Sequence, residues 1–166
     1  MKNQPVLDLP KSAVEVWLDL ASWLFVTITW GLAIGYFSDL PEQIPTHFNA
    51  SGKADGFGSK NTIFLLPAIS LALVGGLIYL AKFPHKFNYI NKIIPENATF
   101  EYRKARIVLS IVNALTSLMF MIITWNVLEG AIAGTSRLGA GFWLVFIALE
   151  IAPLTILLGW NKKSGH

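Results

Sequence analysis

The stretch LPEQIPTHFNASGKADGFGSK, from Leu40 to Lys60, lies between two long apolar segments and lacks their hydrophobic spacing. Its two prolines favour extended backbone in the residues before them, and its Asn, Asp and Gly residues are typical of turns. A connection this long without a clear helix or strand pattern is usually functional or disordered. Because Phe48 and Phe57 have apolar surface to bury, we expect an ordered loop with a function.

The chain as a whole is apolar. Of its 166 residues, 54% are hydrophobic and 14% are charged, and the mean hydropathy is +0.53. This composition lies outside the range of ordinary soluble domains. The formal net charge of +3 does not indicate a nucleic-acid partner, because the basic residues gather in one short segment between apolar runs. The chain has no cysteine, which excludes disulfides and thiolate nucleophiles.

Four segments are long enough to cross a hydrocarbon core, which needs about 20 residues. Backbone groups in lipid must be paired within their own segment, so each is expected to be a helix. We predict an all-α integral membrane protein, a single four-helix membrane domain over residues 1–166, in which Ser12 and Glu15 form a capping box at the first helix. The predicted helices cover about residues 13–37, 61–83, 100–130 and 138–160, with an ordered outer loop at 38–60 and a cytoplasmic loop at 84–106.

The distribution of Lys and Arg predicts the orientation. All but three of the 13 basic residues lie near the termini or around the predicted loop 84–106. The exceptions are Lys53, Lys60 and Arg137. We therefore expect a multi-pass protein of a bacterial plasma membrane, with both termini cytoplasmic, the loop 38–60 outside, and membrane lipids as its surroundings.

Small residues occur at a spacing that favours close helix packing. Gly31 and Gly35 are four residues apart in the first predicted span, and Gly75 and Gly76 lie inside the second. Faces of this kind let helices approach closely. We expect them to pack within one bundle, with a homodimer as the alternative.

The residues of this loop resemble a known family. The ordered pattern consists of Pro45, His47, Phe48, Asn49, Gly52, Asp55, Gly56 and Lys60. It is similar to an uncharacterised bacterial membrane domain, domain of unknown function 1648, which is often the N-terminal half of SdpI-type immunity proteins. The resemblance covers roughly residues 25–76. SdpI-type proteins protect a producing cell from a secreted toxic peptide, and some signal to a membrane-sequestered repressor, so the resemblance implies an extracellular peptide as partner.

The loop offers several candidate ligand-binding side chains. His47 is expected to contact a ligand, to sense pH, or to fix the loop through a hydrogen bond. Asn49 and Asp55 are either turn formers or ligand contacts. Lys60 is expected to pair with Asp55, to reach the lipid headgroups, or to meet an anionic ligand.

Other loop residues are expected to be structural, and the loop does not match a metal site. Pro45, Phe48, Gly52 and Gly56 are predicted to shape the loop backbone. The calcium-loop pattern fails, and His47 with Asp55 is too small a set for zinc. We therefore expect no metal, no cofactor and, in the absence of a nucleophile–base set, no enzyme.

A second candidate site lies inside the predicted membrane domain. Glu150 falls near the middle of the fourth span, where ionisable residues are costly and mark functional sites. Asn113 belongs to a polar stripe on the third span that includes Ser117 and Thr124. We expect a neutral Glu150 to face this stripe. The alternatives are a small proton- or ion-linked transporter element centred on Glu150, or a hydrogen bond that joins helices.

Overall fold

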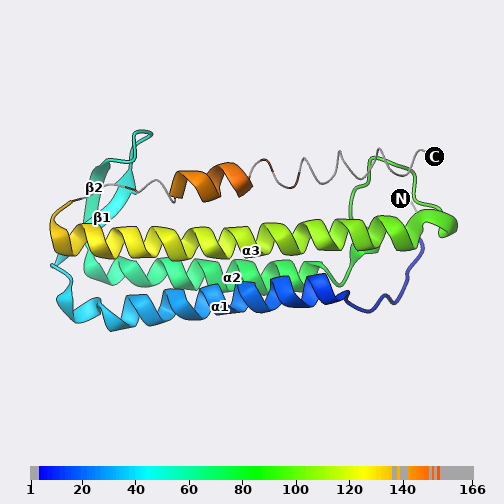
Figure 1. The fold of residues 1–166 in the computed structure, drawn as a ribbon, viewed down its shortest axis with the longest axis horizontal. Coiled ribbons are helices and arrows are strands. Elements are labelled where there is room, and N and C mark those ends of the chain that lie inside the picture. Colours follow the sequence, from blue (N-terminus) through cyan, green and yellow to red (C-terminus); the bar gives the residue numbers. More distant parts are fainter. Residues whose placement is uncertain (1–3, 136–137, 139–141, 150, 152, 154–166) are drawn as a thin grey trace.

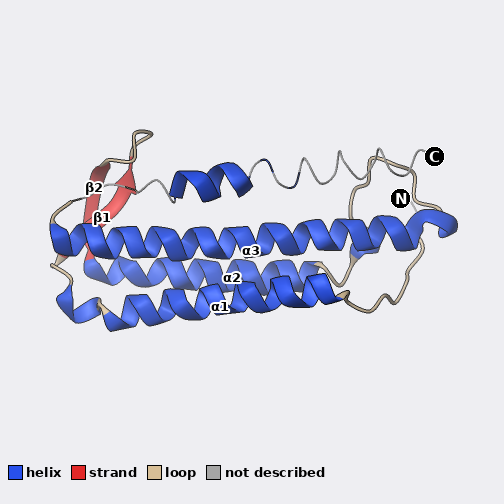
Figure 2. Ribbon diagram, in the orientation of Figure 1, coloured by secondary structure: helices blue, strands red, loops and turns tan. Residues whose placement is uncertain are grey.

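The computed structural model describes residues 4–135, 138, 142–149, 151 and 153. Its body is an elongated bundle of three helices, α1 (Ala13–Gly35), α2 (Leu65–Leu80) and α3 (Pro95–Ala133), in which each helix contacts the other two (Figures 1 and 2). Within the described residues, these three segments, α2 with its leading turn, are long and apolar enough to span a membrane. Three of the predicted spans are thus present, and the fourth, 138–160, lies largely outside the described residues.

The helix ends follow from local hydrogen bonds. The predicted capping box of α1 is confirmed, since the Ser12 N–H donates to Glu15 Oε2 at 2.8 Å and Ser12 Oγ accepts from the Glu15 N–H. The start predicted for α3 is wrong, because its helix begins at Pro95 instead of near residue 100. Proline is well suited to the first helical position, and the Asn97 side chain accepts a hydrogen bond from the Ile94 N–H at 2.9 Å. The predicted cytoplasmic loop 84–106 therefore ends at residue 94.

The prediction of an all-α protein is also wrong. The segment 38–60 forms an antiparallel hairpin of β1 (Gln43–Phe48) and β2 (Ala54–Ser59), flanked by the 3₁₀ turns η1 (Phe37–Asp39) and η2 (Lys60–Phe64). The strand pairing is irregular on either side of His47. Proline in β1 and glycines in β2 are unusual in strands, and these residues concealed the strand pattern in the sequence.

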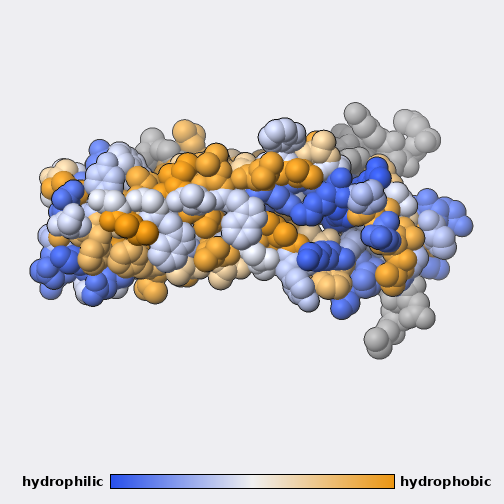
Figure 3. All heavy atoms as spheres, turned by 90° about the horizontal axis from the view of Figure 1, so that it is seen from below, coloured by the Kyte–Doolittle hydropathy of each residue, from blue (hydrophilic) through white to orange (hydrophobic). Residues whose placement is uncertain are grey.

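The bundle places apolar residues outside and polar residues inside along much of its length. In α1, Glu15, Asp19, Ser22 and Thr29 are buried, whereas Trp17 is 71% exposed. This arrangement is the reverse of that in soluble proteins, and it suits a bundle surrounded by lipid, whose helices associate through small and polar contacts. On the face shown in Figure 3, apolar side chains cover the middle of the bundle and hydrophilic ones gather toward both ends.

A cluster of buried apolar residues lies at the end of the bundle that carries the hairpin, here called the hairpin end. It consists of Ala33, Leu40, Ile44, Ile63, Val127 and Leu128. Ile44 joins β1 to this core and so fixes the hairpin on the helices. By contrast, the predicted close packing at Gly31, Gly35, Gly75 and Gly76 is wrong within the described chain, where no other element comes within 4 Å of a side chain built at these positions.

Candidate functional site

An exposed histidine–aspartate contact crosses the hairpin. His47 Nδ1 on β1 contacts Asp55 Oδ1 on β2, and both side chains are exposed. The antiparallel pairing of the strands brings the two residues together although eight positions separate them. Within residues 4–135, His47 has no other hydrogen-bond partner, so no serine or threonine nucleophile is bonded to it. The pair is placed to meet a polar or charged group that approaches from solvent.

The turn of the hairpin is held by Asn49. Its Oδ1 accepts hydrogen bonds from the Ser51 N–H (3.0 Å), the Ser51 hydroxyl (2.7 Å) and the Lys53 N–H (3.1 Å). Gly52 adopts a φ of 73°, which glycine reaches without strain. Asn49 therefore shapes the turn, and its side-chain oxygen is already engaged.

The tip of the hairpin contacts the segment that follows α3. The Leu138 N–H donates to the Gly52 carbonyl at 2.8 Å. A Cβ added at Gly52 would lie 3.5 Å from both Leu138 and the indole nitrogen of Trp143. The turn is thus held from two sides, by its own Asn49 and by this later segment.

Gly56 is needed because the two strands approach each other closely beside the ion pair. A Cβ at Gly56 would lie 2.9 Å from the Cβ of His47, which is too close for any real contact. The predicted structural role of Gly56 thus has a specific cause, since this glycine leaves room for the His47 side chain to reach Asp55.

Lys60 is held at the base of the hairpin. Its Nζ lies 2.9 Å from Glu42 Oε1 and 5.3 Å from the centre of the Phe37 ring. The predicted pairing of Lys60 with Asp55 is wrong, because Asp55 bonds His47 instead. Lys60 connects the end of β2 to the residue before β1, and so closes the hairpin.

An apolar groove of about 300 Å³ runs beneath the hairpin, between β1 and the helices. Its walls include Ile44, Pro45 and Phe48 of β1, Ile69 of α2 and Val127 of α3. Pro45 is buried and Phe48 is half-buried. The volume is at the lower limit for a small-ligand pocket, and it accommodates one large apolar side chain.

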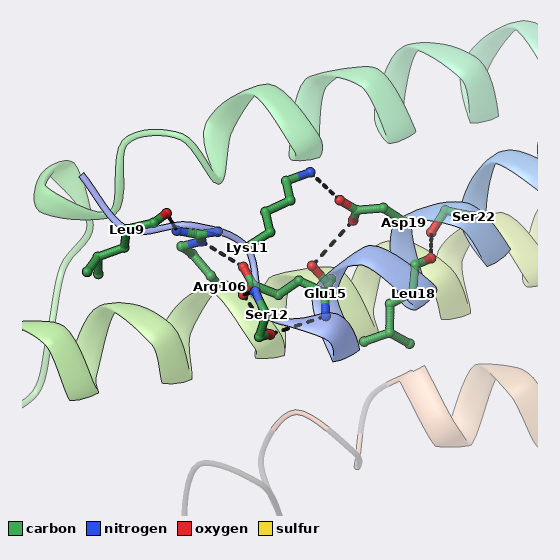
Figure 4. Close-up of polar contacts among 9 residues, drawn as sticks. Leu9, Lys11, Ser12, Glu15, Leu18, Asp19, Ser22 and Arg106 are labelled. Carbon is green, nitrogen blue, oxygen red and sulfur yellow. Dashed lines mark hydrogen bonds and ion pairs between the residues drawn. The ribbon is translucent and has the colours of Figure 1, made fainter. Parts of the chain in front are cut away.

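A second set of functional candidates lies at the opposite end of the bundle, here called the N-terminal end. Arg106 of α3 and Glu15 of α1 form a buried ion pair, with 2.7 Å between Nε and Oε1. Arg106 Nη1 also donates to the Leu9 carbonyl at 2.7 Å. Figure 4 shows Arg106 between Leu9 and Glu15, at the place where the N-terminal segment enters α1.

Asp19 lies one turn further into the bundle and has two partners. Its Oδ2 lies 2.5 Å from Lys11 Nζ, and its Oδ1 accepts a longer hydrogen bond of 3.4 Å from the Ser110 hydroxyl. The Lys11 side chain is 39% exposed whereas that of Asp19 is 13% exposed. Lys11 therefore reaches a buried carboxylate from near the surface.

Asn113 follows Ser110 on the same face of α3 and is 1% exposed. Both its amide oxygen and its amide nitrogen are buried without a hydrogen-bond partner. Asn113, Ser110 and Asp19 line one narrow cavity whose other wall is Leu77 and Ile78 of α2. Further along the bundle, the hydroxyls of Ser70 and Thr124 are also buried without a partner.

The predicted site at Glu150 lies outside the described residues. Asn113 and Ser117 of the polar stripe that Glu150 was expected to face are buried. Among the described residues, no group of three or more His, Asp or Glu side chains is placed to hold a metal ion.

The hairpin and its neighbouring helices are similar to a known family. Residues 24–71 match the model of a family described as a domain of unknown function, DUF1648. The match runs from the second half of α1 through the hairpin into α2. The predicted resemblance to this domain is confirmed, and the link to SdpI-type immunity proteins stays a prediction.

One curated relative also matches. It is described as an uncharacterized protein of Archaeoglobus fulgidus and is 30% identical over 88 residues, which cover 53% of this chain. The chain spans 44% of the length of that relative. No solved structure matches the chain.

Sequence reasoning missed the ion pairs at the N-terminal end. Glu15 was predicted only as part of the capping box, and no partner was predicted for Asp19. The available signal was helical spacing, because Arg106, Ser110 and Asn113 continue the polar stripe of α3 at intervals of four and three residues. Extending the stripe toward the N-terminus of α3 would have reached the partners of both acids.

Proposed function

We propose that this is an integral membrane binding protein whose hairpin recognises an extracellular peptide, as an immunity-type protein would. The observation that carries the proposal is the exposed His47–Asp55 pair on a firmly held hairpin whose strand β1 also lines an apolar groove. A peptide with a charged group and a nearby large apolar side chain would satisfy both. The match to domain 1648 covers these residues.

The hairpin has the features of a pre-organised binding surface. Its turn is fixed by Asn49 and by the contact of Gly52 with Leu138, and its base is fixed by Lys60 and Glu42. A surface that is already ordered loses less conformational entropy when it binds. Protection from a toxic peptide requires that the peptide be held before it damages the membrane, and a rigid outer surface serves this purpose.

The proposal places the hairpin outside the cell and both termini inside. The distribution of Lys and Arg supports this orientation. Because the chain has no cysteine, a single introduced cysteine gives an unambiguous test. Ser51→Cys in whole cells should react with a membrane-impermeant maleimide, and Lys92→Cys should react only after the cells are opened. The reverse pattern would place the hairpin in the cytoplasm and end the proposal.

Survival of a deletion strain exposed to secreted peptides tests the function. Wild type should restore survival. The double variant His47→Ala/Asp55→Ala should not, when the two proteins are present in the membrane in equal amounts. Ile69→Trp narrows the groove from an exposed position and should also abolish protection.

The matched control for the groove is Leu73→Trp. Leu73 lies one turn from Ile69 on the same exposed face of α2, and it is outside the groove lining. Protection should survive this change. If replacement of Leu40–Lys60 by a neutral linker leaves protection intact, the hairpin is not the recognition site.

A further inference from the structure

A cluster of charged and polar side chains at the N-terminal end has no part in the proposed recognition by the hairpin. We propose that Asp19, Ser110 and Asn113 form a binding site for a small monovalent cation of the size of Na⁺, with Lys11 as the internal cation that it displaces. The site lies far along the bundle from the hairpin (Figure 1). The inference therefore stands or falls independently of the proposed function.

The first argument is the incomplete bonding of the three side chains. Asp19 Oδ1 has only the long 3.4 Å hydrogen bond from Ser110. Both polar atoms of the Asn113 amide are buried with no partner, and Asn113 lines the cavity that Asp19 and Ser110 also line. Buried polar groups in folded proteins are nearly always satisfied, and an exception calls for an explanation. An occupant between these side chains would satisfy them.

The chemistry of the donors selects a hard cation. The cavity lining includes a carboxylate, a hydroxyl and an amide side chain, and oxygen ligands of this kind suit hard cations. The cavity between Asn113 and Asp19 has no room for a water molecule. A bare Na⁺ or Li⁺ ion is smaller than a water molecule, whereas K⁺ is about as large, so we expect the site to prefer the two smaller ions.

Lys11 explains how the total charge of the cluster stays balanced in an apolar environment. Glu15 and Arg106 already neutralise each other, and Lys11 neutralises Asp19. An additional charge inside the bundle would be costly. The Lys11 side chain is 39% exposed and comes from the segment before α1, so it can move into water when a cation takes its place. The exchange leaves the total charge of the cluster unchanged.

The test is the thermal stability of the purified full chain in uncharged detergent, measured in NaCl, LiCl, KCl and choline chloride at equal ionic strength. A cation that binds only the folded protein raises the unfolding temperature. We expect Na⁺ and Li⁺ to raise it and K⁺ and choline to have no such effect. Equal unfolding temperatures in NaCl and choline chloride for wild type would overturn the proposal.

Two variants should change the response in opposite directions. Lys11→Gln removes the competing ammonium and should lower the Na⁺ concentration at half effect by up to about fivefold, the upper end for a partly exposed ion pair. Asp19→Asn removes the charged ligand and should abolish the cation-specific rise. If Lys11→Gln requires more Na⁺ than wild type, Lys11 is not a competitor and the exchange mechanism is wrong.

Asn113→Leu separates ion binding from folding. It removes two buried polar atoms that lack partners, so the variant should be at least as stable as wild type in choline chloride. It also removes one cation ligand, so its unfolding temperature should no longer respond to Na⁺. This variant keeps the proposal testable if Asp19→Asn does not fold. A Na⁺ response that persists at wild-type strength in Asn113→Leu would remove this residue from the site and overturn the assignment.

Discussion

Removal of the Arg106 side chain should strongly destabilise the bundle. Arg106 and Glu15 are 7% and 2% exposed and lie 2.7 Å apart, so Arg106→Met leaves a carboxylate buried without its cation. Breaking a buried ion pair from one side costs about 3–5 kcal/mol. Since whole proteins are stable by only about 5–15 kcal/mol, a large fraction of the folding free energy is at stake.

The same geometry predicts a rescue. In Arg106→Met/Glu15→Gln the buried charge is gone, and glutamine keeps the capping-box hydrogen bond to Ser12. What remains lost is the bond from Arg106 to the Leu9 carbonyl, a cost of about 1–2 kcal/mol. The free energy of unfolding of the double variant should therefore exceed that of Arg106→Met alone by about 2 kcal/mol or more.

Arg106→Lys is the matched control, because it keeps the charge. The lysine ammonium cannot reproduce the fixed fork that reaches both Glu15 and Leu9, so a loss of about 1–3 kcal/mol is expected. The assay is equilibrium unfolding of each variant in mixed micelles, followed by circular dichroism. If Arg106→Met costs less than about 1 kcal/mol, or if adding Glu15→Gln brings no recovery, the reasoning from a buried and uncompensated charge is refuted.

Three further predictions concern the hairpin and the loop before α3. Gly56→Ala places a Cβ 2.9 Å from that of His47 and should destabilise the hairpin by about 1–3 kcal/mol, which faster amide exchange in the strands would reveal and unchanged exchange would contradict. Asn49→Ala removes three hydrogen bonds in the turn and should cost about 1–3 kcal/mol, measured as faster proteolytic cleavage there; wild-type cleavage kinetics would show that the turn does not depend on this side chain. Burial raises the pKa of Tyr89, so its phenol stays protonated in the folded chain while it ionises in the unfolded one, and stability should fall as pH rises above about 10. Tyr89→Phe should reduce that alkaline loss while costing about 1 kcal/mol at neutral pH through the lost 2.9 Å bond to the Pro84 carbonyl, and an unchanged alkaline slope in thermal unfolding would argue against the assignment.

The helices were predictable from the sequence because hydropathy and length suffice to identify a span. Their ends were less so. The start of α3 depends on Pro95 and on the Asn97 side chain, and a reading guided by the density of Lys and Arg places the boundary too late. The hairpin was missed for a different reason, since it buries only one short face, chiefly at Ile44, and therefore shows no sustained alternation of apolar and polar residues.

The candidate site was predictable residue by residue but not as an arrangement. His47, Asn49, Asp55 and Lys60 were all selected from the sequence. Which of them contact each other depends on strand register, which brings His47 to Asp55 and leaves Lys60 to Glu42. Register in a short hairpin is set by its turn, and the turn depends on hydrogen bonds that the sequence does not display.

The buried ion pairs were concealed by the argument that predicted the orientation. Lys11 and Arg106 were counted as basic residues beside a membrane, and acidic residues contribute little to that rule. In the folded bundle the same two cations bond Asp19 and Glu15. The two roles are compatible, because orientation is determined while the chain enters the membrane and pairing requires helices already packed. Arg106 and Glu15 are 91 positions apart, so only the packing of α1 against α3 brings them together. Helical spacing marks Arg106 as a member of the polar stripe of α3, but it does not identify Glu15 as its partner.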